Sequence, residues 1–288
     1  MPAATVLVVQ NATSDPPGRL ADWLTLAGLT LDVRNAQAGD PLPVTLDGFE
    51  GLIVLGGEMR AADDDLAPWL PTVRALLHSA VEGEVPTLGV CLGGQLLALA
   101  TGGSVGPNPR GPEYGSQLVA KRAAAAADPL FGALPITPDV IQWHVDAVTK
   151  LPPGAIHLAS SPLCENQAYR IGRLAWGIQF HIETTPALLR MWAELDADPL
   201  AEYDVTAILR RADALDGDLV STWAPFAQAF AAVVEAPHTV APARGGSTST
   251  PAPITDPAAI RAALAAEMAM SRAPHVLPMP GMRRPDIE

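Results

Sequence analysis

The sequence contains little cysteine, little positive charge and no cluster of basic residues. Two cysteines among 288 residues, Cys91 and Cys164, exclude a disulfide framework and fit the reducing cytoplasm, where we expect the protein. Lysine and arginine total 18 against 31 acidic residues, a net charge of −13, so nucleic-acid binding lacks electrostatic support. Spacings typical of a metal site are missing, and we expect neither a metal nor a cofactor.

Long apolar runs are also missing. The apolar stretch at residues 5–9 is too short to cross a membrane, and no basic residues precede it, so we expect neither a signal peptide nor a membrane anchor. Hydrophobic residues still make up 49% of the chain, which supplies a sizeable core. The length suits one large domain with additional segments.

Strand-like and helix-like segments alternate over the first 102 residues. Apolar runs predict strands at 5–10, 29–34, 51–55 and 85–90, with helices between them at 18–27 and from 68, and a further helix at 92–101. This order predicts an α/β fold with a doubly wound, mostly parallel sheet flanked by helices. We then expect an antiparallel extension with strands at 115–121, 139–144, 155–160, 166–171 and 174–180, followed by C-terminal helices at 186–197, 203–213 and 217–235.

Composition changes after residue 235, which we take as the end of the main domain, residues 1–235. Residues 236–254 are rich in Pro, Gly, Ser and Thr and predict a linker. Residues 255–288 form a tail in which Ile260, Leu264 and Met268 make a narrow apolar stripe on a short predicted helix. Such a stripe would dock on its own domain or on a partner chain.

Cys91 lies between a predicted strand and a predicted helix, in the run PTLGVCLGGQLLALATGG. Gly89 and Gly93 have no Cβ, which permits a sharp strand–nucleophile–helix turn. A sulfur at the N-terminus of a helix ionises more readily to the reactive thiolate. The pattern therefore fits a nucleophilic Cys91, although a buried packing cysteine beside turn glycines fits it too. Cys164 has no such glycines and is expected to be a packing residue.

A cysteine nucleophile needs a base with an orienting partner. In the run LAWGIQFHIETTPALL a predicted strand ends at His181 and Glu183, whose side chains point the same way in an extended chain. Glu183 is then placed to orient the imidazole, and Thr184 or Thr185 is placed to cap a helix that has Pro186 in its first turn. A surface histidine followed by a helix-terminal glutamate is the alternative interpretation.

Taken together, these two segments resemble the class I glutamine amidotransferases, which have the patterns G-x-C-x-G-x-Q and, later, Q-F/Y-H-x-E. The run GLIVLGGEM at 51–59 also agrees with this family. GPEYGSQ at 111–117 and IQWHVDAVTKLPPGA at 141–155 are similar to segments of its GMP-synthase branch. The resemblance covers about residues 4–235 and implies the amidotransferase fold for the main domain.

The resemblance implies an enzyme that hydrolyses glutamine through a γ-glutamyl thioester on Cys91. His181, oriented by Glu183, would be the base, and the backbone N–H groups of Gly57 and Leu92 would form the oxyanion hole. The family pattern places the substrate-binding groups at Gln95, Tyr114, Gly115, Ser116 and Gln117.

The chain departs from the family pattern at three positions. Ile182 stands where a proline is usual between the histidine and the glutamate, and Glu58 stands where the pattern has G-G-P. Trp143 replaces the commoner serine before His144. The first two lie near the predicted chemistry without replacing a member of the triad, so they affect the expected shape of the substrate pocket and with it the identity of the substrate.

Two other families with a G-x-C-x-G turn fit less well. In dienelactone-hydrolase-like enzymes the acid precedes the histidine in the chain, whereas Glu183 follows His181. Cysteine hydrolases of the intracellular-protease type often have a histidine directly after the nucleophile, where this chain has Leu92.

The fate of the released ammonia stays open, because no P-loop or S-G-G-x-D-S-type ATP motif occurs. One hypothesis is a glutaminase that serves a partner synthetase on another chain. The second is a free-standing γ-glutamyl hydrolase or peptidase. The third is a binding module without catalysis, against which the intact triad argues. A synthetase or a second copy of the chain is the partner that the tail would contact.

Overall fold

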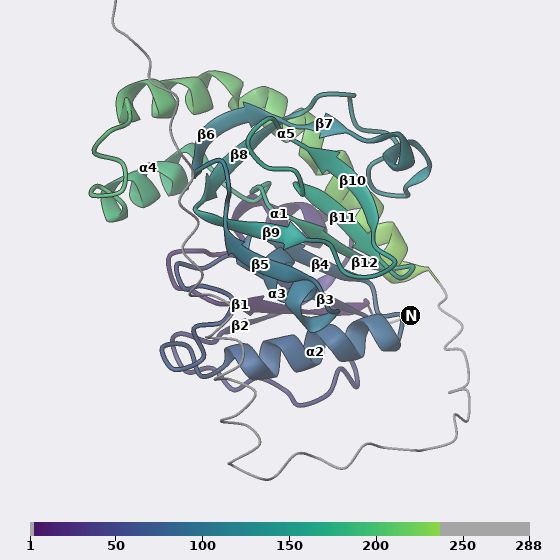
Figure 1. Cartoon of the computed structure of the whole chain (residues 1–288). Helices are drawn as coiled ribbons and strands as arrows, with labels where there is room; N and C mark the ends of the chain where they lie inside the picture. The colour runs from purple at the N-terminus through teal and green to yellow at the C-terminus, as the bar shows by residue number, and fades with distance from the viewer. Residues whose placement is uncertain (1–2, 237–288) are drawn as a thin grey trace, which may run out of the picture. The chain divides into compact units, whose positions relative to one another are not determined.

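The computed structural model describes residues 3–236 of the chain (Figure 1). Its main sheet has eight strands in the order β2-β1-β3-β4-β12-β11-β10-β7. The first five strands of this order are parallel, and the last three add an antiparallel extension. The strands in chain order are β1 (Thr5–Gln10), β2 (Thr30–Asn35), β3 (Gly51–Val54), β4 (Thr87–Val90), β7 (Ala120–Lys121), β10 (Ile156–Ser160), β11 (Ala168–Ile171) and β12 (Ala175–Ile178).

Helices cover both faces of this sheet, as the alternation in the sequence predicts (Figure 1). Successive strand residues point to opposite faces, so Ile53 packs with α1 (Gly18–Leu26) and α5 (Val205–Glu235). Leu52 and Val54 pack on the other face, with α2 (Leu70–Glu82) and α3 (Leu92–Ala100). The prediction of a doubly wound α/β fold with an antiparallel extension is confirmed.

Two small antiparallel ribbons lie outside the main sheet. One pairs β5 (Ser104–Pro107) with β9 (Asp146–Lys150), two strands that the sequence analysis did not predict. The other pairs β6 (Glu113–Leu118) with β8 (Asp139–His144). The single strand predicted at 115–121 is wrong, because β6 ends at Leu118 and the short β7 pairs with β10 instead. A 3-10 helix, η1 (Ala123–Ala127), follows β7.

The C-terminal helices differ from the prediction in one respect. A single helix α5 replaces the two predicted at 203–213 and 217–235. Gly217 lies within this helix, at a position where an added Cβ would meet no other atom within 4 Å. Its apolar stripe of Leu219, Trp223, Phe226 and Phe230 is buried in the core, as predicted.

The helix before α5 begins as its sequence indicates. In α4 (Pro186–Leu195) the Thr185 hydroxyl accepts from the Leu188 N–H at 3.2 Å, and Pro186 occupies the first turn. None of the helices within residues 3–236 is both long and apolar enough to span a bilayer. The predicted linker and the predicted tail helix lie almost entirely outside the described residues and stay predictions.

Candidate active site

Cys91 occupies a sharp turn between β4 and α3. It has φ +51° and ψ −109°, a left-handed conformation that is costly for a residue with a side chain. The glycines on either side allow the turn: a Cβ on Gly89 would lie 2.5 Å from the Gly93 carbonyl oxygen, and one on Gly93 would overlap the Val54 carbonyl. The strand–cysteine–helix turn predicted from the sequence is therefore present, with the sulfur at the N-terminus of α3.

Two backbone segments meet beside this turn. Leu92 is the first residue of α3, so its N–H belongs to the helix turn that has no intrahelical acceptor. Gly57 follows β3 and comes so close to Leu92 that a Cβ on the glycine would lie 3.0 Å from the leucine Cδ2. Both residues line the same cavity as Cys91. This arrangement permits two N–H groups to face an oxygen bound beside the sulfur.

His181 and Glu183 follow β12 and form a buried pair. Nδ1 of His181 lies 2.6 Å from Oε1 of Glu183, and both side chains are at most 2% exposed. Nε2 is therefore the nitrogen left for exchange of a proton with a reacting group. Burial alone lowers the pKa of His181, but the negative charges of Glu183 and Cys91 outweigh it and raise this pKa well above its usual value. The imidazolium form is thus favoured beside the cysteine.

Backbone groups hold Glu183 in place. The Ile182 N–H donates to its other carboxylate oxygen, Oε2, at 2.9 Å. A proline at residue 182, as in the family pattern, has no N–H for this bond. From the opposite side the Arg19 N–H donates to the Glu183 carbonyl at 3.0 Å, and Gly18 has φ +47° where a Cβ would overlap that carbonyl. The start of α1 is therefore packed against the predicted triad acid.

The cavity beside Cys91 has a volume of about 280 Å³. This is at the lower end of the roughly 300–1,000 Å³ that is usual for small-molecule pockets, so the space suits a small substrate. Its walls come from distant parts of the chain: the loop after β1, the loop after β3, α3, the β6–β8 ribbon and α4 with the turn after it. Cys91 and His181 both belong to its lining.

Aromatic side chains form one wall of the cavity. Trp192 of α4 contacts the His181 ring at 4.7 Å between centroids, and Trp143 lies between Trp192 and Tyr114. The indole N–H of Trp143 donates to Asp196 at 2.7 Å, which ties this wall to the turn after α4. Trp143, one of the departures from the family pattern, therefore lies in the cavity wall, which the sequence analysis did not predict.

Asp15, in the loop between β1 and α1, is a cavity residue that the sequence analysis did not identify. A Cβ on Gly56 would lie 2.7 Å from Oδ1 of Asp15 and 3.1 Å from Cε1 of His181, so the carboxylate and the imidazole flank the same glycine. Burial raises the pKa of Asp15 to about 6, an effect that the positive charge of His181 reduces and the charges of Glu183 and Glu58 reinforce. The Asp15 carboxyl group therefore lies beside the predicted triad, in surroundings that disfavour its ionised form.

We expect Asp15→Asn to stabilise the protein at neutral pH. The Asp15 carboxyl ionises near pH 4 in the unfolded chain but only near pH 6 in the folded protein. The wild-type free energy of unfolding therefore falls as pH rises from about 4 to about 6, and above pH 6 the full destabilisation by the ionised carboxylate is present. Asparagine keeps an acceptor for the Ser14 hydroxyl, which bonds Asp15 at 2.7 Å, and cannot ionise. The expected gain is about 1–3 kcal/mol at neutral pH and none below about pH 4.

Urea unfolding of the Asp15→Asn variant and of the wild type, at neutral pH and below about pH 4, measures the expected difference in the free energy of unfolding. A gain of equal size at neutral pH and below pH 4, or a loss at neutral pH, would contradict the assignment of a partly buried, titrating carboxyl at residue 15.

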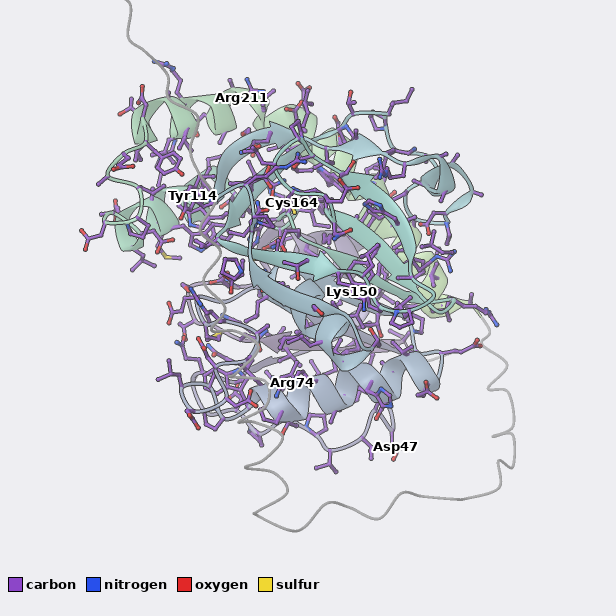
Figure 2. All side chains as sticks on the ribbon, in the orientation of Figure 1. Asp47, Arg74, Tyr114, Lys150, Cys164 and Arg211 are labelled. Atoms are coloured by element: carbon purple, nitrogen blue, oxygen red, sulfur yellow. The ribbon has the colours of Figure 1, made fainter. Side chains whose placement is uncertain are left out.

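The structure brings some of the predicted substrate-binding residues to the cavity. Gln95 and Tyr114 line it. Tyr114 also packs against Ala193 and Leu200, beside α4 (Figure 2). The next three residues, Gly115 to Gln117, continue along β6 and do not line the cavity. Their role in substrate binding stays a prediction.

A second cluster of titratable groups lies behind the cavity. Glu113, His144 and Cys164 are buried, with potential ligand atoms within 4.8 Å of one another. The Glu113 carboxylate already accepts from Ser161 and Gln167 and lies 3.0 Å from Nε2 of His144, and the second His144 nitrogen bonds the Asp146 carbonyl. Burial, reinforced by the charge of Glu113, raises the pKa of the Cys164 thiol to about 12. These donors fit a closed hydrogen-bond network better than a metal site.

Sequence comparisons agree with the motifs. A family model described as glutamine amidotransferase class-I matches residues 20–191. The glutamine amidotransferase-like protein YfeJ of Salmonella typhimurium is 30% identical over 183 residues, which are 62% of this chain and 74% of YfeJ. The glutamine-hydrolyzing GMP synthase of Thermomicrobium roseum is 38% identical over 134 residues, or 46% of this chain, and that match spans only 23% of the synthase.

Structural comparison gives the same result. A crystal structure of a glutamine amidotransferase from Methylobacillus flagellatus is similar with a TM-score of 0.73 at 34% identity, covering 81% of this chain and 95% of that one. The family model spans more than half of the chain. The chain therefore belongs to the class I glutamine amidotransferase family.

Proposed function

We propose that the chain hydrolyses the side-chain amide of glutamine, with Cys91 as the nucleophile. The observation that carries this proposal is the arrangement of Cys91 and His181 on the wall of one small cavity, with Glu183 bonded to Nδ1 of His181. The thiolate attacks the amide carbon, and the N–H groups of Gly57 and Leu92 stabilise the oxyanion. The His181 imidazolium gives its proton to the leaving ammonia, which leaves a γ-glutamyl thioester that water then hydrolyses.

Gln95 supports an amino acid as the substrate. Both hydrogens of its amide face acceptors, the Asp146 carbonyl at 3.0 Å and Oε1 of Gln179 at 3.2 Å. Its own oxygen is left as an acceptor in a side chain that lines the cavity, which suits the α-ammonium group of glutamine. Tyr114 also lines the cavity.

A γ-glutamyl derivative of a cationic amine is the second candidate substrate. Asp15 and Glu58 line the cavity near His181, the residue that protonates the leaving amine. Carboxylates there would attract a positively charged leaving group, and Trp143 and Trp192 would contact its carbon chain. This candidate corresponds to the free-standing γ-glutamyl hydrolase that the sequence left open.

The ammonia acceptor, if one exists, would lie outside the described residues. The matched GMP synthase of Thermomicrobium roseum is a longer protein, of which this match spans about a quarter. We propose that an amidotransferase role, in contrast to simple hydrolysis, requires a synthetase on another chain. A second copy of this chain is the other partner that the sequence suggested.

Substrate assays separate the two candidates. Purified full-length protein is incubated with glutamine, with a γ-glutamyl amide of a neutral amine and with a γ-glutamyl amide of a diamine, and released glutamate is measured. Preference for glutamine supports the first candidate, and preference for the diamine derivative supports the second. Failure of the unlabelled protein to release glutamate from any of them, when a separate sample of the same preparation is labelled at Cys91 by a glutamine-like diazo-ketone, would contradict the proposal.

A further inference from the structure

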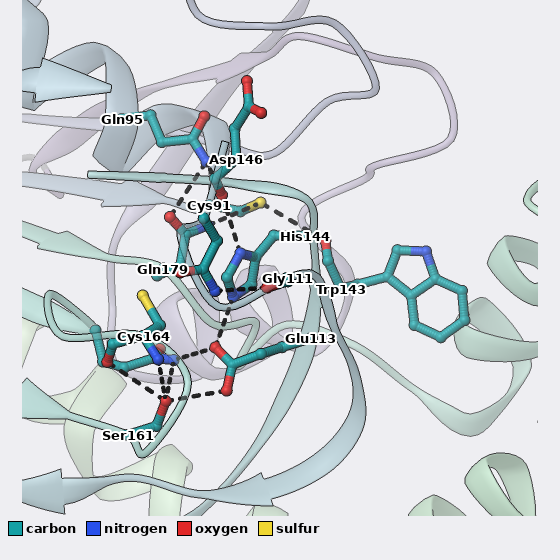
Figure 3. A network of polar contacts seen from close by, with 12 residues as sticks. Cys91, Gln95, Gly111, Glu113, Trp143, His144, Asp146, Ser161, Cys164 and Gln179 are labelled. Carbon is teal, nitrogen blue, oxygen red and sulfur yellow. Dashed lines mark hydrogen bonds and ion pairs between the residues drawn. The ribbon is translucent and has the colours of Figure 1, made fainter. Parts of the chain in front are cut away.

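A continuous network of polar contacts runs from β6 to Cys91 (Figure 3). It begins at Glu113, whose carboxylate is fully buried. One oxygen accepts from the Ser161 hydroxyl at 2.9 Å, and the other accepts from the Gln167 amide at 2.8 Å and lies 3.0 Å from Nε2 of His144. These contacts hold Glu113 and His144 at the far end of the network from the sulfur.

The Asp146 carbonyl is the next member and fixes how the network is oriented. It lies 2.9 Å from Nδ1 of His144 and 3.0 Å from Nε2 of Gln95. A backbone carbonyl only accepts hydrogen bonds, so His144 must carry a proton on Nδ1 and Gln95 must turn its NH2 group toward Asp146. The amide orientation of Gln95 therefore follows from the backbone.

This orientation passes on to Gln179, which follows β12. The Gln95 NH2 group also donates to Oε1 of Gln179 at 3.2 Å, so that oxygen must be the acceptor. The amino group of Gln179 is left facing Cys91, with Nε2 3.6 Å from Sγ. Gln95 and Gln179 are 5% and 3% exposed, which leaves little room for either amide to turn.

We propose that Gln179 is a positioning residue that stabilises the Cys91 thiolate by donating an amide N–H to its sulfur. This rests on the proposed function, in which Cys91 is the nucleophile. An N–H bond to a sulfur anion is stronger than the same bond to a neutral thiol, so it favours the ionised sulfur and fixes its direction. His181 supplies the positive charge, and Gln179 supplies a neutral donor that does not consume a proton.

The test uses Gln179→Met, which fills the same space without a donor, and Gln179→Glu, which places an acid beside the sulfur. Ionised Cys91 is measured as the thiolate absorbance of each protein minus that of its Cys91→Ser derivative. The rate of Cys91 alkylation by iodoacetamide is followed by peptide mass spectrometry. At neutral pH we expect Gln179→Met to lower the alkylation rate about threefold to tenfold, and Gln179→Glu to lower it further. At alkaline pH, where the thiol is ionised in wild type and Gln179→Met alike, their rates should converge.

Gln167→Met is the matched control. Gln167 is as buried as Gln179, but its amide donates to Glu113 and Ser161 and not to the sulfur. Its replacement tests the cost of losing a buried amide in the same network and should leave the thiolate signal unchanged. Equal losses in the Gln167 and Gln179 variants, or a wild-type thiolate signal in Gln179→Met, would overturn the proposal. A Gln179-dependent thiolate in a protein that hydrolyses no γ-glutamyl compound would instead contradict only the proposed function.

Discussion

Replacing Cys91 by alanine is expected to lower kcat for glutamine hydrolysis by about 10⁴-fold or more. The reaction that we propose forms a covalent bond to Sγ, so the variant keeps the cavity and loses the chemistry. The loss should appear in kcat, measured at saturating glutamine, while binding of glutamine by calorimetry is largely retained. Alanine has no γ atom to crowd the turn, and its Cβ occupies the position of the cysteine Cβ.

Cys164→Ala is the matched control, because Cys164 is the other cysteine of the chain. Its thiol is 2% exposed and has a pKa raised by burial to about 12, so it stays neutral and out of reach of solutes. A glutamine-like diazo-ketone should label Cys91 alone in the wild type and in Cys164→Ala. Labelling of Cys164, or unchanged turnover in Cys91→Ala, would show that the nucleophile is assigned to the wrong residue.

Local sequence signals predicted the features that local geometry controls. The glycines around Cys91 indicated its sharp turn, and the spacing of two residues between His181 and Glu183 indicated that their side chains meet, as the 2.6 Å contact shows. The order of strands and helices predicted the doubly wound sheet, because such connections follow general rules of handedness and length.

Features that depend on distant contacts were not predicted. Strands β5 and β9 are short and pair across about forty residues of sequence, from Ser104 with Lys150 to Pro107 with Asp146, so neither has a pattern of its own. Two helices were predicted at 203–213 and 217–235, but burial of Trp223 and its neighbours stabilises one continuous α5 that includes Gly217. Packing outweighs the roughly 1 kcal/mol that a glycine costs within a helix.

The same limit applies to the site. Asp15 follows β1 and faces His181 only because the chain folds the two segments together. Gln179 was part of a recognised motif, yet its direction toward the sulfur depends on Gln95 and on a backbone carbonyl of the β9 ribbon. Neither contact leaves a periodicity or spacing in the sequence, so only the structure shows Asp15 beside His181 and Gln179 beside Cys91.

Loss of the predicted base should be more damaging than loss of its partner. We expect His181→Ala to lower kcat about 10²–10⁴-fold, since His181 moves the proton from the thiol to the leaving group. The decrease in kcat should be about 10–10² times smaller for Glu183→Gln than for His181→Ala, because the carboxylate acts only through the imidazole. His78→Ala, which changes an exposed histidine on α2, should leave kcat unchanged.

The pH dependence of kcat distinguishes the role of Glu183 from a purely structural one. The negative charge of Glu183 contributes to the raised pKa of His181, so Glu183→Gln should lower that pKa. The protonated imidazole is the proton donor, and the alkaline limb of the kcat profile reports its loss. This limb should therefore move to lower pH in Glu183→Gln, while the smaller rate loss persists at its optimum. An alkaline limb that stays in place or moves to higher pH in Glu183→Gln would mean that Glu183 does not act on His181 through its charge. A kcat within about twofold of wild type in His181→Ala would rule out the triad itself.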